Sequence, residues 1–225
     1  MVKPYELIVF DWDGTLMDSV AKIVASLRAA AVEAGLPALK DEQLRNVIGL
    51  GMQEAFEALY PNVEEKQQAR FVDSYRHHFV VVCPKPEALF EGVRELLNAL
   101  SQQPLRLGVA TGKSRKGLDR VLANTGCGGY FHATRCADES RSKPNPHMLL
   151  ELIEELGVEP DKTLMIGDSE YDMAMANAAG TDALAVTYGV HEPQRLGLHE
   201  PLAMIDSVAA LEEWFNINSL INPKL

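Results

Sequence analysis

Two short apolar runs of the chain are each followed by a pair of aspartates, which are Asp11, Asp13, Asp168 and Asp172. The runs 7–10 and 163–166 are typical of buried strands, along which side chains alternate in direction. Asp11 and Asp13 could therefore project from one face, with Gly14 permitting a sharp turn behind them. If the two runs are neighbouring parallel strands, the four carboxylates meet at one sheet edge and repel one another unless a cation neutralises them. Hard oxygen ligands of this kind favour Mg²⁺.

Two further segments supply groups that could hold an oxyanion. Thr111 and Gly112 follow the apolar run 105–110, and Lys143 stands just before Pro144. The Thr111 hydroxyl, the Gly112 N–H and the Lys143 ammonium could together bind a phosphoryl group. This set favours phosphoryl transfer, which needs positioning and charge neutralisation more than elaborate covalent chemistry.

Alternating strands and helices must position these residues. The predicted strands are 7–10, 105–110, 163–166 and 183–187, with 131–136 as a weaker fifth. Segments between the later runs repeat apolar residues at helical spacing, and Gly157 and Gly180 are typical helix ends. This alternation predicts an α/β fold with a doubly wound, mainly parallel sheet.

Nearly a hundred residues separate the first strand from the second, and most of them have a helical pattern. We therefore expect an α/β core formed by residues 1–16 and 87–225, with a small α-helical cap, residues 17–86, inserted after the first strand. Ligands of open α/β sheets bind beyond the carboxyl ends of the strands, so a crevice between the cap and those ends is the expected site.

The segments DWDGTLMDS, VATGK, KPNP and GDSEYD, in this order, resemble the four motifs of the haloacid dehalogenase-like hydrolase superfamily, and in particular its phosphoglycolate phosphatase-like members. The resemblance covers nearly the whole chain and implies a Rossmann-like core with a cap. It implies a phosphatase that hydrolyses a small phosphate monoester, such as phosphoglycolate or a sugar phosphate, with Mg²⁺ as cofactor.

The same resemblance implies a role for each motif residue. Asp11 would be the nucleophile that forms an aspartyl phosphate, and Asp13 would be the general acid and then the general base. Thr111, Gly112 and Lys143 would hold the phosphoryl oxygens. The implied Mg²⁺ ligands are Asp11, the Asp13 carbonyl, Asp168 and Asp172, the last directly or through water.

Several of these residues also have a purely structural interpretation. Ser169 and Asp172 have the spacing of a helix cap, and capping and metal binding can coexist. Thr111 could instead cap the next helix. For Lys113 and Arg115, a solvated helix start and a phosphate contact are equally consistent with the sequence.

In the predicted cap, the candidates for contact with the leaving group are Arg45, Gly49, Leu50, Gly51 and Met52. The two glycines fit a plain helix–helix turn equally well. His77 and His78 lie on a helical stretch and are expected to be exposed rather than metal ligands, and Trp12 is expected to turn inward.

Other activities remain as alternatives. A pyrophosphatase or nucleotide phosphatase on the same fold is the runner-up, and a phosphoacceptor signalling domain fits less well, because a helical insertion replaces the region where its phosphoacceptor would lie. Asp13 disfavours a dehalogenase. Ile23 stands where a sugar-phosphate mutase would carry a histidine, and Met52 near where a phosphonatase would carry a lysine.

The composition of the chain limits the kinds of partner that we expect it to bind. The chain has 225 residues, 47% of them hydrophobic, and a formal net charge of −11, which disfavours nucleic acid as a partner. No apolar run approaches the roughly 20 residues that span a bilayer. Cys83, Cys127 and Cys136 are widely spaced, which favours reduced thiols and a cytoplasmic protein. We expect a small phosphorylated metabolite as substrate and a monomer or homodimer.

Overall fold

A six-stranded sheet, entirely parallel, forms the centre of the computed structural model, which describes residues 5–83 and 87–221. The strand order is β5-β4-β1-β6-β7-β8. The strands are β1 (Leu7–Phe10), β4 (Arg106–Thr111), β5 (Ala133–Cys136), β6 (Thr163–Gly167), β7 (Asp182–Val186) and β8 (Ala203–Ile205). The predicted parallel α/β fold is confirmed, and the five predicted strands are all present. The edge strand β8 was not predicted, because three residues with one exposed side chain give too short a pattern.

The first strand is central, with β4 on one side and β6 on the other. Phe10 is level with Val109 and with Ile166, and the Asp11 N–H donates to the Ile166 carbonyl at 2.9 Å. The segments that follow these three strands therefore lie at one edge of the sheet.

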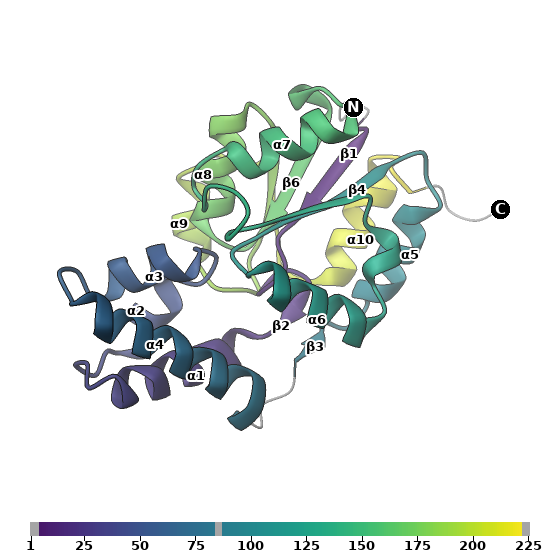
Figure 1. Cartoon of the computed structure of the whole chain (residues 1–225). Coiled ribbons are helices and arrows are strands. Elements are labelled where there is room, and N and C mark those ends of the chain that lie inside the picture. Colours follow the sequence, from purple (N-terminus) through teal and green to yellow (C-terminus); the bar gives the residue numbers. More distant parts are fainter. Residues whose placement is uncertain (1–4, 84–86, 222–225) are drawn as a thin grey trace.

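Helices cover both faces of the sheet (Figure 1). One face packs against α5 (Val93–Ser101), α6 (Arg115–Thr125) and α10 (Val208–Ile217). The other packs against α7 (His147–Leu156), α8 (Glu170–Ala179) and α9 (Pro193–Gly197). Along β1 the side chains alternate between the two cores, so that every one of its four residues is buried. Two short 3₁₀ helices, Gly128–Tyr130 and Pro160–Lys162, lie in the connections.

Local signals for the helix ends hold in the structure. Helices α7 and α8 end at Gly157 and Gly180, whose φ angles of 62° and 73° are in the left-handed region that glycine adopts without strain. Trp12 is buried as expected, and its ring packs edge-on against Phe131 at 6.1 Å between centroids.

A second group of helices lies beside the carboxyl ends of the strands (Figure 1). It consists of α1 (Val20–Glu33), α2 (Asp41–Asn46), α3 (Met52–Leu59), α4 (Glu65–His77) and the π-helix η1 (His78–Val82). We call residues 20–82 the cap helices. They have an apolar core of their own, which includes Leu27, Phe56 and Phe71. A short antiparallel pair, β2 (Met17–Asp18) and β3 (Ala88–Leu89), joins them to the rest of the chain and was not predicted.

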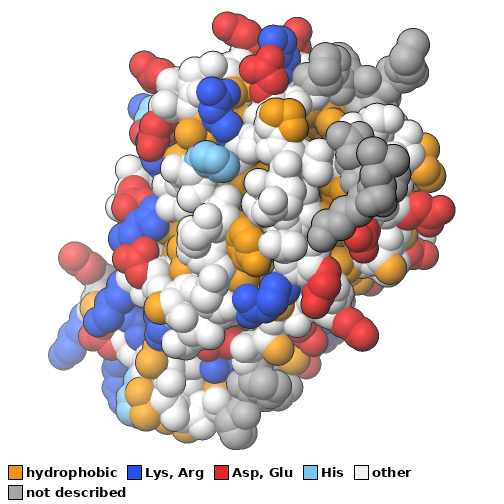
Figure 2. Space-filling view, turned by 90° about the vertical axis from the view of Figure 1, so that its right-hand side faces the viewer, with side chains coloured by type: hydrophobic (Ala, Val, Ile, Leu, Met, Phe, Trp, Pro, Cys, Tyr) orange, Lys and Arg blue, Asp and Glu red, His pale blue; other side chains and the backbone are white. Residues whose placement is uncertain are grey.

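The surface of the protein carries charged side chains of both signs. On the face shown in Figure 2, acidic and basic side chains are interspersed, and hydrophobic side chains form small separate spots. Among the described helices, none is long and apolar enough to cross a bilayer. Cys83, Cys127 and Cys136 are all free thiols.

Candidate active site

Three of the four predicted aspartates form a buried cluster at the carboxyl edge of the sheet. Asp11 directly follows β1, Asp168 directly follows β6, and Asp172 lies in the first turn of α8. One carboxylate oxygen from each of the three lies within 4.8 Å of the others. Such a set of hard oxygens can hold a divalent cation.

Lys143 is the counter-charge inside this cluster. Its side chain is fully buried, and its Nζ lies 2.8 Å from Asp11 Oδ1 and 2.6 Å from Asp172 Oδ1. Burial lowers the pKa of Lys143, but attraction to the two carboxylates outweighs this and leaves the pKa raised. The ammonium is therefore charged, and in this structure it neutralises the carboxylates directly.

One ammonium does not balance three carboxylates. Burial, opposed by Lys143 and reinforced by Asp172, raises the pKa of Asp11 from 3.8 to about 7. The pKa of Asp168 is also raised well above its usual value, mainly by burial and further by repulsion from Asp11 and Asp172. The second oxygen of Asp11, Oδ2, has no hydrogen-bond partner among the described residues. An orphaned buried carboxylate oxygen in an excess of negative charge is the environment that a cation would relieve.

Neighbouring groups fix Asp168 and Asp172. The Thr15 hydroxyl and the Val190 N–H each donate to Asp168 at 2.8 Å. Asp172 Oδ2 accepts hydrogen bonds from the N–H and the hydroxyl of Ser169, which forms a capping box at the start of α8. Asp172 therefore caps the helix with one oxygen and faces Lys143 with the other, so both interpretations of this residue fit the structure.

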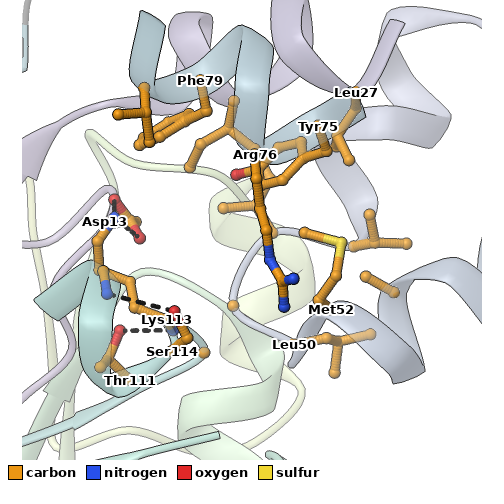
Figure 3. Close-up of a pocket in the computed structure, with 18 of the residues that line it drawn as sticks. Asp13, Leu27, Leu50, Met52, Tyr75, Arg76, Phe79, Thr111, Lys113 and Ser114 are labelled. Atoms are coloured by element: carbon orange, nitrogen blue, oxygen red, sulfur yellow. Dashed lines mark hydrogen bonds and ion pairs between the residues drawn. The ribbon is translucent and has the colours of Figure 1, made fainter. Parts of the chain in front are cut away.

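Asp13 does not join the cluster, contrary to the predicted meeting of four carboxylates. Its carboxylate accepts from Lys113 Nζ at 2.8 and 2.9 Å and from the Ser19 hydroxyl at 2.6 Å. The prediction assumed strand alternation, but β1 ends at Phe10, so Asp13 lies beyond the extended segment. Its side chain faces the cavity instead (Figure 3).

Thr111 and Gly112 line the same cavity as Asp11 and Asp13. Thr111 is buried at the end of β4, and its hydroxyl oxygen accepts from the Lys113 N–H at 3.2 Å. It does not cap α6, whose cap is the side chain of Ser114. A side chain at position 112 would come within 2.6 Å of the Gly49 carbonyl oxygen. The close approach of the cap helices to the Thr111 loop therefore requires glycine at this position.

Lys113 belongs to a group of charges around one aromatic ring, which the sequence did not indicate. The ammonium groups of Lys113 and Lys22 lie 5.1 and 5.0 Å from the centre of the Phe79 ring, and the Arg120 guanidinium lies at 5.5 Å. Glu87 accepts from Lys22 at 3.1 Å and from both arms of Arg120. The solvated helix start considered for Lys113 is wrong, since its side chain is buried against Asp13. No local signal could have found this group, because its members range from residue 22 to residue 120 of the chain.

The cavity between the cap helices and the strand ends has a volume of about 580 Å³. Gly49, Leu50 and Met52 line it, as proposed from the sequence. Arg45 does not, because its guanidinium donates to the Gly189 carbonyl. Gly51 lies beside the cavity and donates its N–H to the Ser142 hydroxyl at 2.7 Å.

The remaining candidates lie elsewhere or have other partners. Arg115 is outside the cavity and pairs with Glu139, so it makes no contact with the predicted phosphate position. His77 is exposed and lines the cavity. His78 is only partly exposed, and its ring lies 2.8 Å from Glu33.

Comparison with known proteins agrees with this geometry. The model of the haloacid dehalogenase-like hydrolase family matches residues 8–186. The chain is 32% identical over 194 residues to an N-acetylmuramic acid 6-phosphate phosphatase of Pseudomonas aeruginosa, covering 83% of this chain and 84% of that protein. It is 31% identical over 218 residues to a phosphoglycolate phosphatase of Pseudomonas putida, covering 91% of this chain and 78% of that protein.

A solved structure shows the same architecture. The crystal structure titled as a predicted phosphatase from Clostridium acetobutylicum superimposes with a TM-score of 0.83 at 26% identity, covering 95% of this chain and 99% of that one. The fold, the strand-end carboxylates and these matches together show that the chain belongs to the haloacid dehalogenase-like hydrolase family. Within that family it is a phosphatase.

Proposed function

We propose that the protein hydrolyses a small-molecule phosphate monoester, with Asp11 as nucleophile and Mg²⁺ as cofactor. The observation that carries the proposal is the environment of Asp11. This buried carboxylate has one oxygen with no partner among the described residues, lies in a cluster with two further aspartates and a buried lysine, and lines the cavity beside Thr111.

The donor set fits a magnesium ion. Asp11, Asp168 and Asp172 offer only carboxylate oxygens, and their excess negative charge calls for a cation. The Asp13 carbonyl, implied by the family resemblance, stays a predicted ligand. When bound, Mg²⁺ would neutralise charge on the nucleophile and on the phosphoryl oxygens.

The side chains of the chain itself would perform the bond-making steps. An Asp11 oxygen attacks phosphorus, and the bond between phosphorus and the ester oxygen breaks as Asp13 donates a proton to that oxygen. Asp13 then accepts a proton from water, which attacks the phosphorus of the aspartyl phosphate and releases inorganic phosphate. Lys113 and Ser19 hold the Asp13 carboxylate at the cavity for both steps.

The groups around the phosphoryl position support this assignment. The Thr111 hydroxyl and the Gly112 N–H are proposed to bind phosphoryl oxygens, as anion sites formed by oriented amides and hydroxyls do. The Lys143 ammonium already forms ion pairs with Asp11 and Asp172. It would therefore bind a phosphoryl oxygen while it also holds these two carboxylates in position.

The substrate is proposed to be a small phosphorylated metabolite. The names of the two relatives, one for a two-carbon acid phosphate and one for a sugar-acid phosphate, define the range from which the leaving group would come. We further propose that the protein acts in the cytoplasm, as a monomer or homodimer.

A pair of variants tests the mechanism. Asp11→Asn should abolish steady-state turnover with Mg²⁺ while leaving the circular dichroism spectrum unchanged, because an amide is a poor nucleophile. Asp13→Asn should retain a burst of p-nitrophenol from p-nitrophenyl phosphate, roughly one per active site, followed by turnover slowed ~10²–10⁴-fold. Activity of Asp11→Asn within tenfold of wild type would remove Asp11 from the nucleophile role, and the absence of a burst would remove Asp13 from the second step.

A further inference from the structure

The part of the cavity wall that the cap helices supply is almost entirely apolar. Its apolar members are Ile23, Leu27, Val47, Ile48, Leu50, Met52, Ala55, Tyr75, Phe79 and Val80. The groups that would bind the phosphoryl oxygens come from the opposite wall, at the strand ends. Because the phosphoryl end is fixed by that wall, the leaving group of a bound ester must extend toward the apolar side.

Among the described residues, the cap helices place no buried cation in the cavity wall, because the buried Lys22 lies outside it and pairs with Glu87. Apart from the Tyr75 hydroxyl, the polar side chains that the described cap helices place in the wall are those of Arg76 and His77. Arg76 extends into the cavity (Figure 3), but its side chain is exposed and 3.8 Å from Asp73. On the opposite wall, Lys113 is paired with Asp13 and Arg120 with Glu87, while Lys116 is exposed. A carboxylate in the leaving group would lose water and could gain only the exposed side chains of Arg76 and Lys116 as partners, and exposed ion pairs contribute little.

One polar atom does reach the apolar wall. The Tyr75 ring stacks on Phe79, with ring centres 5.6 Å apart and planes inclined by 22°. The side chain lies at the cavity (Figure 3), and its hydroxyl has no hydrogen bond to any residue that the structure describes. It is available as a hydrogen-bonding group for a ligand.

We infer that this site selects phosphate monoesters whose leaving group has an apolar face of about the size of a ring, in preference to those of short charged acids. The inference rests on the proposed function and adds the substrate class. A cavity of about 580 Å³ lies within the range of ~300–1,000 Å³ that holds drug-sized ligands, and a two-carbon leaving group leaves most of the apolar wall uncovered.

The test compares three substrates of the magnesium-loaded wild-type enzyme. Benzyl phosphate and 2-phosphoglycolate are both esters of primary alcohols and differ in the apolar or charged nature of the leaving group. Acetyl phosphate has little to place against the cap helices and reports the chemistry of the strand ends. Since a single methylene in an apolar pocket is worth ~10–200-fold, kcat/KM for benzyl phosphate should exceed that for 2-phosphoglycolate at least tenfold.

Two matched variants locate the effect. Met52→Gln keeps the length of the side chain but makes this part of the wall polar, and should lower the ratio of kcat/KM for benzyl phosphate to that for acetyl phosphate about fivefold or more. Val81→Gln makes the same kind of change on a 70% exposed side chain of the cap helices that does not line the cavity, and should leave the ratio unchanged.

Each outcome decides a different point. Turnover of acetyl phosphate together with equal or better use of 2-phosphoglycolate overturns the inference and leaves the proposed function standing. An unchanged ratio in Met52→Gln also overturns it, because the wall would then not contact the leaving group. Turnover of none of the three substrates overturns the proposed function itself, and the inference with it.

Discussion

Removing divalent cations should make the stability of this protein fall as pH rises from about 5 to about 7. Without a cation, the pKa of Asp11 is about 7 in the folded protein against 3.8 in an exposed carboxyl. The folded state therefore binds a proton that the unfolded state has already released. The stability that this proton confers is fully present below about pH 4 and is lost as pH rises through 7. In the proposed function Mg²⁺ would take the place of the proton, so stabilisation by Mg²⁺ should grow over the same interval.

The expected size follows from linkage. One proton displaced on metal binding changes the free energy of unfolding by about 1.4 kcal/mol per pH unit, so two units give about 2.7 kcal/mol from Asp11 alone. Asp168, whose pKa is raised by burial and by Asp11 and Asp172, adds to this in the same direction. In a chain of this length, 2.7 kcal/mol corresponds to roughly 5–10 °C in Tm.

Urea unfolding measures this quantity directly. The free energy of unfolding is determined at about pH 5, 6 and 7 in saturating MgCl₂ and in EDTA, and the difference between the two is plotted against pH. In Asp11→Asn one titrating carboxyl is gone, so the difference should rise less steeply. A difference that stays constant with pH in the wild type would refute the idea that Asp11 binds a proton and a metal ion in competition.

Two further changes test how the groups at the strand ends are held in position. Gly112→Ala should lower kcat/KM in a phosphatase assay, because the new methyl group would meet the Gly49 carbonyl. The expected loss is ~10²-fold, which is typical when catalytic groups are misplaced by about 1 Å. The control Gly117→Ala lies in the same wall but causes no backbone clash, and its kcat/KM should remain near that of the wild type. Lys113→Met should slow turnover by roughly 10–100-fold, because the ion pair that holds Asp13 is lost. Partial rescue by Lys113→Arg would show that the charge of Lys113 matters and not only its packing, whereas an unchanged kcat in Lys113→Met would contradict this role.

The sequence by itself determined the parts of this protein that depend on local patterns. Continuous apolar runs marked four of the six sheet strands, since strands buried on both faces need apolar residues at every position, and a weaker pattern at 131–136 marked β5. Glycines marked the ends of α7 and α8, because a left-handed residue is required there. The aspartates that follow β1 and β6 could also be placed together from the sequence, because neighbouring parallel strands bring their carboxyl ends to one edge of the sheet.

Only the tertiary structure decided which charges meet. Asp13 lies 100 residues from Lys113 in the chain, and their pairing depends on how the chain turns after β1, which the alternation of a strand does not describe. Lys143 could be expected at the site, but its position between Asp11 and Asp172 follows from packing in three dimensions.

The residues that form the cavity wall also could not be predicted from the sequence. Its apolar members read as ordinary core positions of amphipathic helices, and nothing in their spacing distinguishes a side chain buried against a neighbouring helix from one that borders a cavity. That difference is set by how far the cap helices stand from the strand ends. The distance is fixed by contacts between remote segments, such as the Gly49 loop against Gly112, which no local pattern encodes.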